Sequence, residues 1–355
     1  MIILYKRFCV ILCILLLLPS FVYADDISAD AAVVMDAGTG QVLYSRNIDS
    51  QRPMASTTKL MTCLLACERG KLSDIVVITE EMLYGTEGSM IYVKAGDRIT
   101  LSDLVRGAML ASGNDAANAI AVYLAGSVKD FVALMNQRAA EIGMLHTKFV
   151  TPSGLDKGGH KSTAYDMALL AAQAVQNTEL MQIAKLTACD ITINDKPQTI
   201  YNHNKLLSYD KNFIGLKTGY TKKAGRCLIS AYQYGGSVII VVTLSAPDDW
   251  NDHKTLVSHA KKWYKRIDKT NSVTISAVGG DKNGVRAAYP VKCCCIGDYT
   301  VREYYYPFVY APLSAGQVVG RAEVYLGNTS VYTAEIKTTE GLAQWQITKS
   351  DYKNS

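Results

Sequence analysis

The spacing of apolar residues changes twice along this chain, and this change constrains the fold more than any other feature. Apolar runs at 31–35 and 41–45 flank the turn-like segment 36–40 and are typical of a β-hairpin. Between residues 101 and 176 apolar residues recur at helical spacing and alanine is frequent. Strand-like runs return after Ile191. We therefore expect an α+β fold, in which an antiparallel sheet carries a helical lobe as an insertion.

Start and stop signals divide the helical part into separate helices. Pro53 precedes one of them, Ser127 and Gly143 bound another, and Ser162 or Thr163 caps a third. Two of the predicted helices carry a clear apolar stripe: Leu60, Met61, Leu64 and Leu65 in the helix after Pro53, and Leu101, Leu104, Val105 and Ala108 in the helix that ends before Ser112-Gly113.

The end of the main domain reads as three strands and a helix. Runs at 216–221, 226–234 and 237–245 predict the strands, with Gly235-Gly236 as a tight turn between the last two. Residues 252–267 predict a final amphipathic helix.

Residues 272–348 predict a small, separate β domain, because their short apolar runs lie at 273–277, 300–305, 317–326 and 332–338. A chain of 355 residues also has room for two domains of roughly 150 residues each. We expect one domain over 25–268, a link near 268–271, the β domain at 272–348 and a tail at 349–355.

The first 24 residues have the three parts of a secretory signal peptide. Lys6 and Arg7 precede an unbroken apolar run at 8–18, and Val22-Tyr23-Ala24 offers small residues where a signal peptidase cuts. The run is short for a spanning helix, which needs about 20 residues, although it can be extended to Ala24. An uncleaved anchor is the alternative. We expect cleavage and a mature protein that works outside the cytoplasm.

The charge balance argues against a nucleic-acid partner. The chain has 37 Lys+Arg against 32 Asp+Glu, and loss of Lys6 and Arg7 with the signal peptide leaves 35 against 32, a net charge of +3. Nucleic-acid-binding proteins normally carry a basic stripe. The sequence shows none, so we expect no nucleic-acid partner.

The cysteines predict neither a metal site nor a disulfide framework. Nine cysteines minus Cys9 and Cys13 leave seven, an odd number that cannot pair completely within one chain. Cys63 and Cys67 lie four residues apart on a predicted helix, where thiols pack as small apolar side chains. The side chains of 293–295 alternate between two faces of a strand-like stretch, so they cannot converge on a metal. We expect mostly free thiols and no metal cofactor.

The strongest chemical signal is Ser56-Thr57-Thr58-Lys59 at the start of a predicted helix. Residues three apart share a helix face, so the Lys59 amine can reach the Ser56 hydroxyl. A serine is a weak nucleophile until a base takes its proton, and lysine can be that base when burial or a nearby cation lowers its pKa. The helix N-terminus also favours an anionic transition state. The pattern alone is weak, because such a serine is more often a helix cap and because it recurs at Ser208/Lys211, Ser258/Lys261 and Ser350/Lys353.

Two further motifs give this signal weight. Ser112-Gly113-Asn114 lies in a break between predicted helices, where the hydroxyl can relay a proton and the carboxamide can hold a peptide group. A helix stop followed by a cap is its structural alternative. Lys217-Thr218-Gly219 enters a strand, where Lys217 and Thr218 can bind a carboxylate and Gly219 allows close approach of a ligand. A plain strand edge is the alternative there. Ser-x-x-Lys, Ser-x-Asn and Lys-Thr-Gly in this order resemble the trio of penicillin-binding proteins and class A β-lactamases.

Longer segments make the resemblance more specific. Residues 54–62, 112–117 and 215–221 resemble the signature segments of serine-type D-alanyl-D-alanine carboxypeptidases, the low-molecular-mass penicillin-binding proteins. Residues 160–164 and 224–227 add matches, and nearly all of the mature chain is covered. The resemblance implies a β-lactamase/DD-peptidase-like catalytic domain followed by a small C-terminal β-sandwich.

The resemblance also implies the chemistry. Such enzymes remove the terminal D-Ala from peptidoglycan stem peptides that end in D-Ala-D-Ala, through a covalent acyl-enzyme and without a cofactor, and β-lactam antibiotics inhibit them. By position, Ser56 is the nucleophile, Lys59 the base for acylation and our choice for deacylation, and Ser112 passes a proton toward the leaving amine. The other roles carried over are substrate or Lys59 orientation by Asn114, carboxylate recognition by Lys217 and Thr218 beside Gly219, and an oxyanion hole from the backbone N–H groups of Ser56 and Tyr220.

Three other functions fit parts of the pattern. A class A-like β-lactamase needs a carboxylate for fast deacylation, usually in a Glu-x-x-Leu-Asn segment, and neither Glu141 nor Glu179, the only glutamates between Ser112 and Lys217, begins one. A catalytically inactive wall-binding protein would keep the scaffold, although each catalytic position here holds the expected residue. A Ser-His-Asp hydrolase is a further option, but the sequence has no G-x-S-x-G elbow, and no histidine lies in a segment typical of such an enzyme. The five histidines are His146, His160, His203, His253 and His259.

One departure from the family concerns the membrane. Many members end in an amphipathic helix that lies on the membrane surface. Residues 337–355 offer only Leu342, Trp345 and Ile347 as larger apolar side chains, too few for an apolar stripe. We therefore expect weak or no membrane contact after signal cleavage.

Overall fold

The computed structural model describes residues 27–295 and 297–346; the predicted signal peptide, Ile347 and the predicted tail lie outside the described residues. The helices are η1 (Ala55–Thr58, a 3-10 turn), α2 (Lys59–Arg69), α3 (Glu80–Leu83), α4 (Leu101–Met109), α5 (Asn114–Ala125), α6 (Val128–Ile142), α7 (Ala164–Ala174), α8 (Thr178–Ala184), α9 (Leu206–Tyr209) and α10 (Asp249–Trp263). The strands are β1 (Ala31–Asp36), β2 (Val42–Arg46), β3 (Ile75–Val77), β4 (Arg98–Thr100), β5 (Ala188–Ile193), β6 (Lys196–Tyr201), β7 (Phe213–Thr221), β8 (Gly225–Tyr234), β9 (Ser237–Leu244), β10 (Lys265–Ile275), β11 (Val285–Cys295), β12 (Thr300–Tyr305), β13 (Val318–Leu326) and β14 (Thr329–Thr338).

A five-stranded antiparallel sheet forms the centre of the molecule, in the order β2-β1-β9-β8-β7. The expected hairpin of β1 and β2 joins it through β9, with Ala31 opposite Leu244 and Asp36 opposite Ile239. Both faces of β9 are buried, because Ile240 and Val242 belong to one apolar cluster and Ile239 and Val241 to another. β7 lies at the edge, so one side of its backbone is not paired within this sheet.

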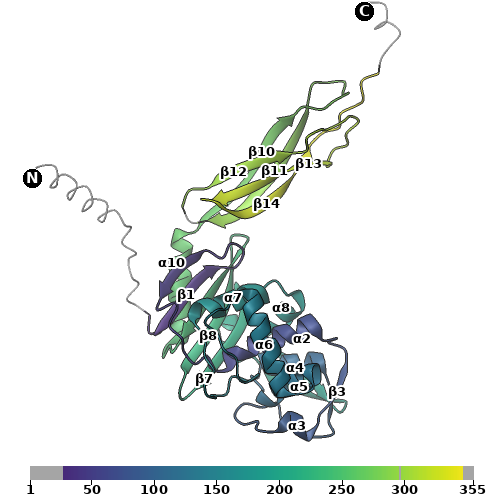
Figure 1. The fold of residues 1–355 in the computed structure, drawn as a ribbon. Coiled ribbons are helices and arrows are strands. Elements are labelled where there is room, and N and C mark those ends of the chain that lie inside the picture. Colours follow the sequence, from purple (N-terminus) through teal and green to yellow (C-terminus); the bar gives the residue numbers. More distant parts are fainter. Residues whose placement is uncertain (1–26, 296, 347–355) are drawn as a thin grey trace, which may run out of the picture.

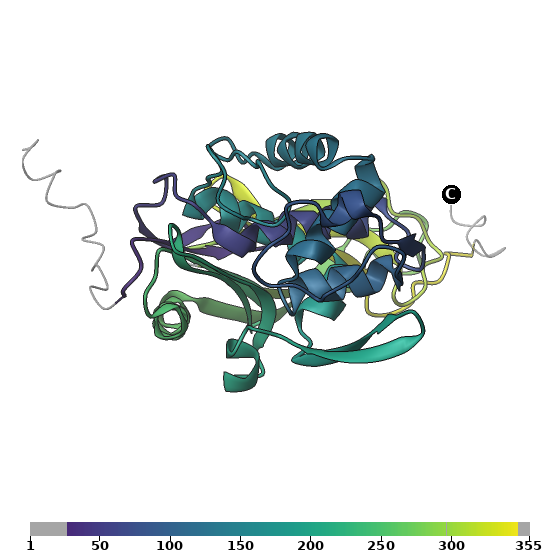
Figure 2. The ribbon, with the colours of Figure 1, turned by 90° about the horizontal axis from the view of Figure 1, so that it is seen from below.

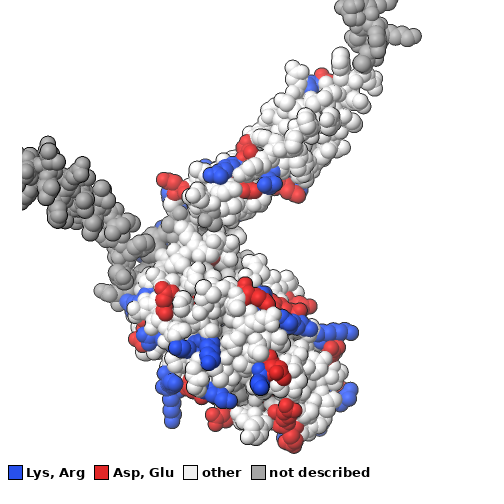
Figure 3. Space-filling view, viewed as in Figure 1, with Lys and Arg blue, Asp and Glu red and all other residues white. Residues whose placement is uncertain are grey.

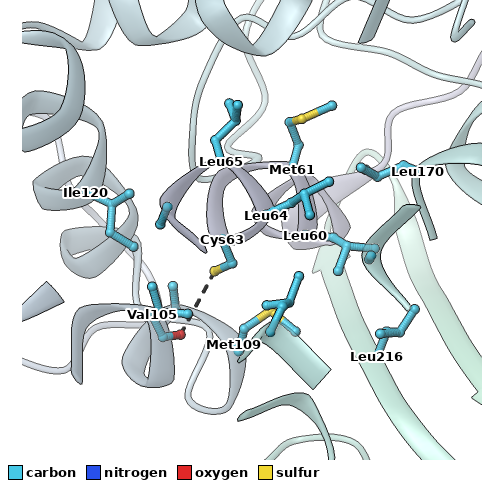
Figure 4. Packing of buried hydrophobic residues seen from close by; sticks show 14 of the residues in the cluster. Leu60, Met61, Cys63, Leu64, Leu65, Val105, Met109, Ile120, Leu170 and Leu216 are labelled. Carbon is cyan, nitrogen blue, oxygen red and sulfur yellow. Dashed lines mark hydrogen bonds between the residues drawn. The ribbon is translucent and has the colours of Figure 1, made fainter. Parts of the chain in front are cut away.

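The predicted helical lobe is inserted between β2 and β7 and covers one face of the sheet (Figure 1). Helix α2 lies within this lobe, and its apolar residues up to Ala66 are at most 1% exposed. Figure 4 shows them packed among α4, α5, α7 and β7: Leu60, Met61, Cys63, Leu64 and Leu65 beside Val105, Met109, Ile120, Leu170 and Leu216.

The predicted caps of the lobe are confirmed. The hydroxyls of Ser127 and Thr163 accept hydrogen bonds from the N–H groups of Asp130 and Asp166 at the starts of α6 and α7. Gly143 ends α6 in the left-handed region, at φ 91°. A second sheet, β3-β4-β5-β6, was not predicted, because β3 and β4 have only three residues each and β6 buries only Ile200.

Helix α10 covers the opposite face of the central sheet (Figure 2), where Leu256, Val257 and Ala260 pack with residues of β8 and β9. The bounds predicted for this helix were wrong. It begins at Asp249 and ends at Trp263, so the predicted link at 268–271 lies inside β10. The chain leaves the helix early because Ile267 pairs with Cys293 of β11 and is buried in the cluster of the C-terminal sheet.

The C-terminal strands form one antiparallel sheet, in the order β10-β11-β14-β13-β12, which lies apart from the helical lobe in Figure 1. Among the described residues its two halves are joined over a short stretch, where Ala287 and Ala288 of β11 pair with Thr338 and Lys337 of β14. The sheet can therefore curl so that its two halves enclose the apolar cluster of this domain, as in the expected sandwich. Most of β11 was not predicted; the sequence marked only residues 293–295 as strand-like.

No single helix of the described residues is long and apolar enough to cross a membrane. Helices α5 and α6 reach the length and apolar composition of a membrane span only when they are taken together, and they are bent by 86° relative to each other.

Candidate active site

Ser56 lies in the η1 turn that leads into α2. The residue before it, Ala55, has a left-handed φ of 47°, which is unfavourable for a residue with a Cβ. The turn packs against β7 at Gly219, where a Cβ would lie 2.9 Å from the backbone nitrogens of both Ser56 and Thr57. The sequence predicted Gly219 as a place where a ligand approaches the backbone. In the structure the close neighbour of Gly219 is the Ser56 turn itself.

Lys59 is fully buried directly behind Ser56. Its Nζ lies 2.9 Å from Ser56 Oγ, 2.6 Å from Asn114 Oδ1 and 2.6 Å from the carbonyl oxygen of Ser153. Burial, and next the charge of Lys217, hold the pKa of Lys59 well below its usual value. A lysine in this environment can be neutral at a pH at which an exposed lysine is charged.

The partners of Lys59 also determine the direction of its hydrogen bonds. Asn114 donates its Nδ2 to the carbonyl of Glu87, so its Oδ1 faces Lys59 as an acceptor, and the Ser153 carbonyl is an acceptor by nature. A neutral amine has two N–H groups and one lone pair. The two carbonyl oxygens take both N–H groups, which leaves the lone pair for the Ser56 hydroxyl. The site can therefore accept the proton of Ser56.

Ser112 lies between α4 and α5, as predicted, and has a left-handed φ of 60°. It is 5% exposed and lines the same cavity as Ser56. Asn114 is the first residue of α5, and its backbone N–H donates to the carbonyl of Ser89 at 2.7 Å. The next residue, Asp115, accepts the N–H groups of Ile91 and Tyr92, which holds the preceding loop against the helix.

Lys217 and Thr218 point in different directions from β7. Thr218 lines the cavity, whereas Lys217 is 1% exposed and donates its Nζ to the Thr218 carbonyl at 3.1 Å. Burial lowers the pKa of Lys217 to about 8. Lys217 therefore lies behind the cavity wall, close enough to Lys59 for the two charges to repel each other.

A cavity of about 500 Å³ contains the accessible residues of these motifs, and sequence reasoning missed seven of its twelve lining residues. The only missed residue with a sequence signal was Arg226, in the matched segment 224–227. Arg226 donates to Asp249 at 2.9 Å, and its guanidinium lies 5.5 Å from the ring centre of Trp250. The lining residues are Ser56, Ser89, Ser112, Asn202, His203, Lys205, Thr218, Gly219, Tyr220, Arg226, Asp249 and Trp250.

A larger cavity, of about 890 Å³, lies on the other side of Ser153, between α3, α5 and α6. It contains neither Ser56 nor Ser112, so size alone does not identify the reactive site. The smaller cavity is the one that Ser56 lines, with the buried amine of Lys59 behind it.

The arrangement disfavours two of the alternatives. Among the described lining residues Asp249 is the only carboxylate, and it is engaged with Arg226. Glu141 instead bonds to Arg138 on α6, and Glu179 lies in the first turn of α8. No imidazole of the described residues makes a hydrogen bond to Ser56; the ring of His160 bonds to Thr58 and that of His253 to Ser230.

No group of three His, Cys, Asp or Glu side chains in the described part of the chain is arranged to hold a metal ion. The thiols of Cys63, Cys67, Cys189, Cys227 and Cys295 are free.

Comparison with known proteins supports the same chemistry. A family model described as D-alanyl-D-alanine carboxypeptidase matches residues 19–248. The chain is 35% identical over 235 residues to the D-alanyl-D-alanine carboxypeptidase DacF of Bacillus subtilis, a match that covers 64% of this chain and 60% of that protein. It is 33% identical over 340 residues to DacC of Escherichia coli, with 87% of this chain and 83% of that protein covered.

Solved structures with a similar fold include penicillin binding protein 5 from Haemophilus influenzae, with a TM-score of 0.66 at 26% identity over 91% of this chain and 100% of that chain. PBP3 from Streptococcus pneumoniae, described as a peptidoglycan synthesis regulatory factor, gives a TM-score of 0.74 at 24% identity over 89% of this chain and 99% of that chain, which is a likeness of fold alone.

Proposed function

Because this chain belongs to the D-alanyl-D-alanine carboxypeptidase family, we propose that it removes the terminal D-Ala from peptidoglycan stem peptides as a serine peptidase. The observation that carries the proposal is the buried Lys59 amine, whose two carbonyl acceptors leave its lone pair for Ser56. This is the geometry that a serine nucleophile with a lysine base requires.

In the acylation step Ser56 Oγ attacks the carbonyl carbon of the penultimate D-Ala while its proton moves to Lys59 Nζ. The backbone N–H groups of Ser56 and Tyr220 receive the oxyanion, a role supported by the close packing of Gly219 on the Ser56 turn. The peptide bond then breaks, and Ser112 passes its proton to the amine of the departing D-Ala and recovers one from Lys59, which leaves Lys59 neutral for the next step. Asn114 acts by orienting Lys59, because its Oδ1 faces that amine.

In the deacylation step a water molecule attacks the ester on Ser56. Lys59 takes the proton of this water, and the Ser56 oxygen leaves and recovers a proton, which returns the enzyme to its starting state. No metal or cofactor takes part in either step of this scheme.

The terminal carboxylate of the substrate binds beside Thr218, which lines the cavity. Lys217 is buried, so we propose that it acts through its charge, which makes this end of the cavity positive and keeps Lys59 neutral. β-Lactam antibiotics enter the same cavity and acylate Ser56. The adduct is expected to persist, because Asp249, the cavity's described carboxylate, is held by Arg226.

The place of action follows from the substrate. We propose that residues 1–24 direct export, that the mature chain works on the cell wall outside the cytoplasm, and that it makes weak or no contact with the membrane. Residues 25–264 form the catalytic domain, and the chain from β10 onward forms a second domain. On the face shown in Figure 3 basic and acidic side chains are interspersed, which supports the absence of a nucleic-acid partner.

The direct test is release of free D-Ala from a synthetic stem peptide that ends in D-Ala-D-Ala. Mature protein and a Ser56→Ala variant are compared, and labelled penicillin is followed on both. We expect release and a long-lived penicillin adduct with the parent protein and neither with the variant. Release by both proteins would exclude Ser56, and release by neither would favour an inactive wall-binding protein. Rapid penicillin turnover would favour a β-lactamase.

A further inference from the structure

His160 lies under the active site without contacting Ser56 or Lys59. It is 6% exposed, and both of its ring nitrogens make hydrogen bonds. The backbone N–H of Val150 donates to Nδ1 at 2.9 Å, and Nε2 lies 2.8 Å from the hydroxyl of Thr58, the residue before Lys59.

These contacts determine the proton position on the ring. Nδ1 accepts from a backbone N–H, so it carries no proton and Nε2 does. The Thr58 hydroxyl donates to the carbonyl of Ala55 at 2.8 Å, which leaves its oxygen free to accept from Nε2. The donors therefore form one chain in a single direction: Val150 to His160, His160 to Thr58, and Thr58 to Ala55.

The segment that His160 holds also carries a partner of Lys59. Three residues after Val150, the Ser153 carbonyl accepts from Lys59 Nζ, and the Pro152 carbonyl accepts from the Thr62 hydroxyl at 2.6 Å. The next residue, Gly154, has a φ of 86°, and a Cβ there would lie 1.9 Å from the Ala55 carbonyl oxygen. The segment 150–154 and the Ser56 turn are thus in backbone contact, with the imidazole as the link between them.

We propose that His160 is a positioning residue for Lys59: its neutral ring ties segment 150–154 to the Ser56 turn, so that the Ser153 carbonyl takes one N–H of Lys59 and the lone pair stays on Ser56. This inference rests on the proposed role of Lys59 as the base. A protonated ring would direct a second N–H at that of Val150 and break the link. Burial lowers the pKa of His160 to about 4, so the neutral form is present at neutral pH.

The charged groups around the two residues are few. Asp156 acts on His160 from the same loop. Lys217 of β7, Cys63 of α2 and Asp115 of α5 act on Lys59. A neutral imidazole carries no charge, so the effect of His160 on Lys59 is steric and passes through the Ser153 carbonyl.

The test compares His160→Gln and His160→Asn with His253→Gln. His253 is a matched control, because it is equally a buried imidazole of α10, with hydrogen bonds to Ser230 and Thr243, and it does not line the cavity. The readout is the rate of Ser56 acylation by a fluorescent penicillin from pH 5 to pH 10, beside the melting temperature and the KM for D-Ala release.

We expect the His160 variants to acylate roughly tenfold to a hundredfold more slowly at pH 7, the usual cost of a reacting group displaced by about 1 Å. The acid limb of their pH profile should move to higher pH, because water reaches Lys59 and burial lowers its pKa less. KM should change less than twofold. His253→Gln should lower the melting temperature and leave both the rate at pH 7 and the acid limb unchanged.

A second pair of variants covers the case in which the His160 variants do not fold. Thr58→Val keeps the shape and removes the acceptor of Nε2, so it should shift the acid limb in the same direction, while Thr58→Ser should restore the parent profile. An unmoved acid limb in folded Thr58→Val or His160 variants would overturn the inference. If the parent protein is acylated by penicillin but releases no D-Ala, the proposed substrate is wrong. The effect of His160 on acylation can still be measured in that case.

Discussion

The catalytic part of the chain and the C-terminal sheet bury different kinds of side chain. Residues 27–264 bury two lysines, two histidines and several carboxylates, among them Lys59, Lys217, His160, His253 and Asp115. In the described part of the C-terminal sheet, the buried side chains that carry a hydroxyl group are those of Thr338 and Tyr289. Charged residues of that sheet instead form surface pairs, such as Arg286 with Glu340 and Arg321 with Glu323.

Burial of a charge is unfavourable unless it is well paired, so a chain retains buried charges mainly where they have a use. In the catalytic part, the lysines gain lowered pKa values and a defined set of hydrogen-bond partners. The C-terminal sheet gets its stability from apolar packing and a hydrogen-bonded ladder. The first region should therefore respond strongly to pH and to single substitutions, and the second weakly.

The largest expected effect is at Lys59. Lys59→Ala removes the base and should slow acylation of Ser56 by roughly 10²- to 10⁴-fold. Lys59→Arg should be nearly as slow, because a guanidinium keeps its proton at any working pH. The measurement is burst acylation by a fluorescent penicillin, with Arg321→Ala as the control. A Lys59→Ala rate within threefold of the parent protein would exclude lysine as the base.

The pH dependence of D-Ala release should form a bell. Activity rises as Lys59 loses its proton, at a pH well below the usual lysine pKa, and falls as Lys217 becomes neutral near its pKa of about 8. Lys217→Arg stays charged, so its descending limb should move to higher pH. The measurement is kcat/KM from pH 5 to pH 10, after the variant's melting temperature has been checked. A descending limb that stays in place would assign it to another group.

Between pH 7 and pH 5, folding stability should fall in the catalytic part and change little in the C-terminal sheet. The folded-state pKa values of His160 and His253, about 4 and about 3, lie below the usual value of about 6.5. Between these values the unfolded chain binds more protons than the folded one, so the stabilisation is complete above pH 6.5 and is lost as the pH falls. All five histidines precede β10.

Urea unfolding of a Trp345→Phe variant, followed by tryptophan fluorescence, checks this prediction. The two remaining tryptophans, Trp250 and Trp263, both lie in α10, before β10. The urea concentration at half-unfolding should be lower at pH 5 than at pH 7, and the difference should be smaller when His253→Gln is added. An equal difference with and without His253→Gln would assign the pH dependence to other groups.

The smallest effect is expected in the C-terminal sheet. Arg321 pairs with Glu323 at 2.7 Å, but its side chain is 60% exposed. Exposed ion pairs contribute little, so Arg321→Ala should leave both the free energy of unfolding and D-Ala release nearly unchanged. Calorimetry and the release assay check both parts. A large loss of activity would show that the two regions are coupled.

The sequence alone determined the class of fold, the position of most elements and the three motifs around the cavity. These features are local: apolar spacing selects helix or strand, a serine or glycine bounds a helix, and Ser56 and Lys59 are neighbours on any helical turn. The errors concern elements that are not determined locally. The end of α10 and the small sheet were missed, because Ile267 and the short strands β3 and β4 depend on partners far along the chain.

Only the tertiary structure decided how the motifs work together. It buried Lys217 and left Thr218 in the cavity, turned the Ser153 carbonyl toward Lys59, and placed His160 beneath Thr58. A backbone carbonyl has no residue type of its own, and the burial of a side chain depends on what other segments cover it. The sequence therefore indicated which groups are candidates for the chemistry, and the packing of distant segments set their burial and their hydrogen-bond partners.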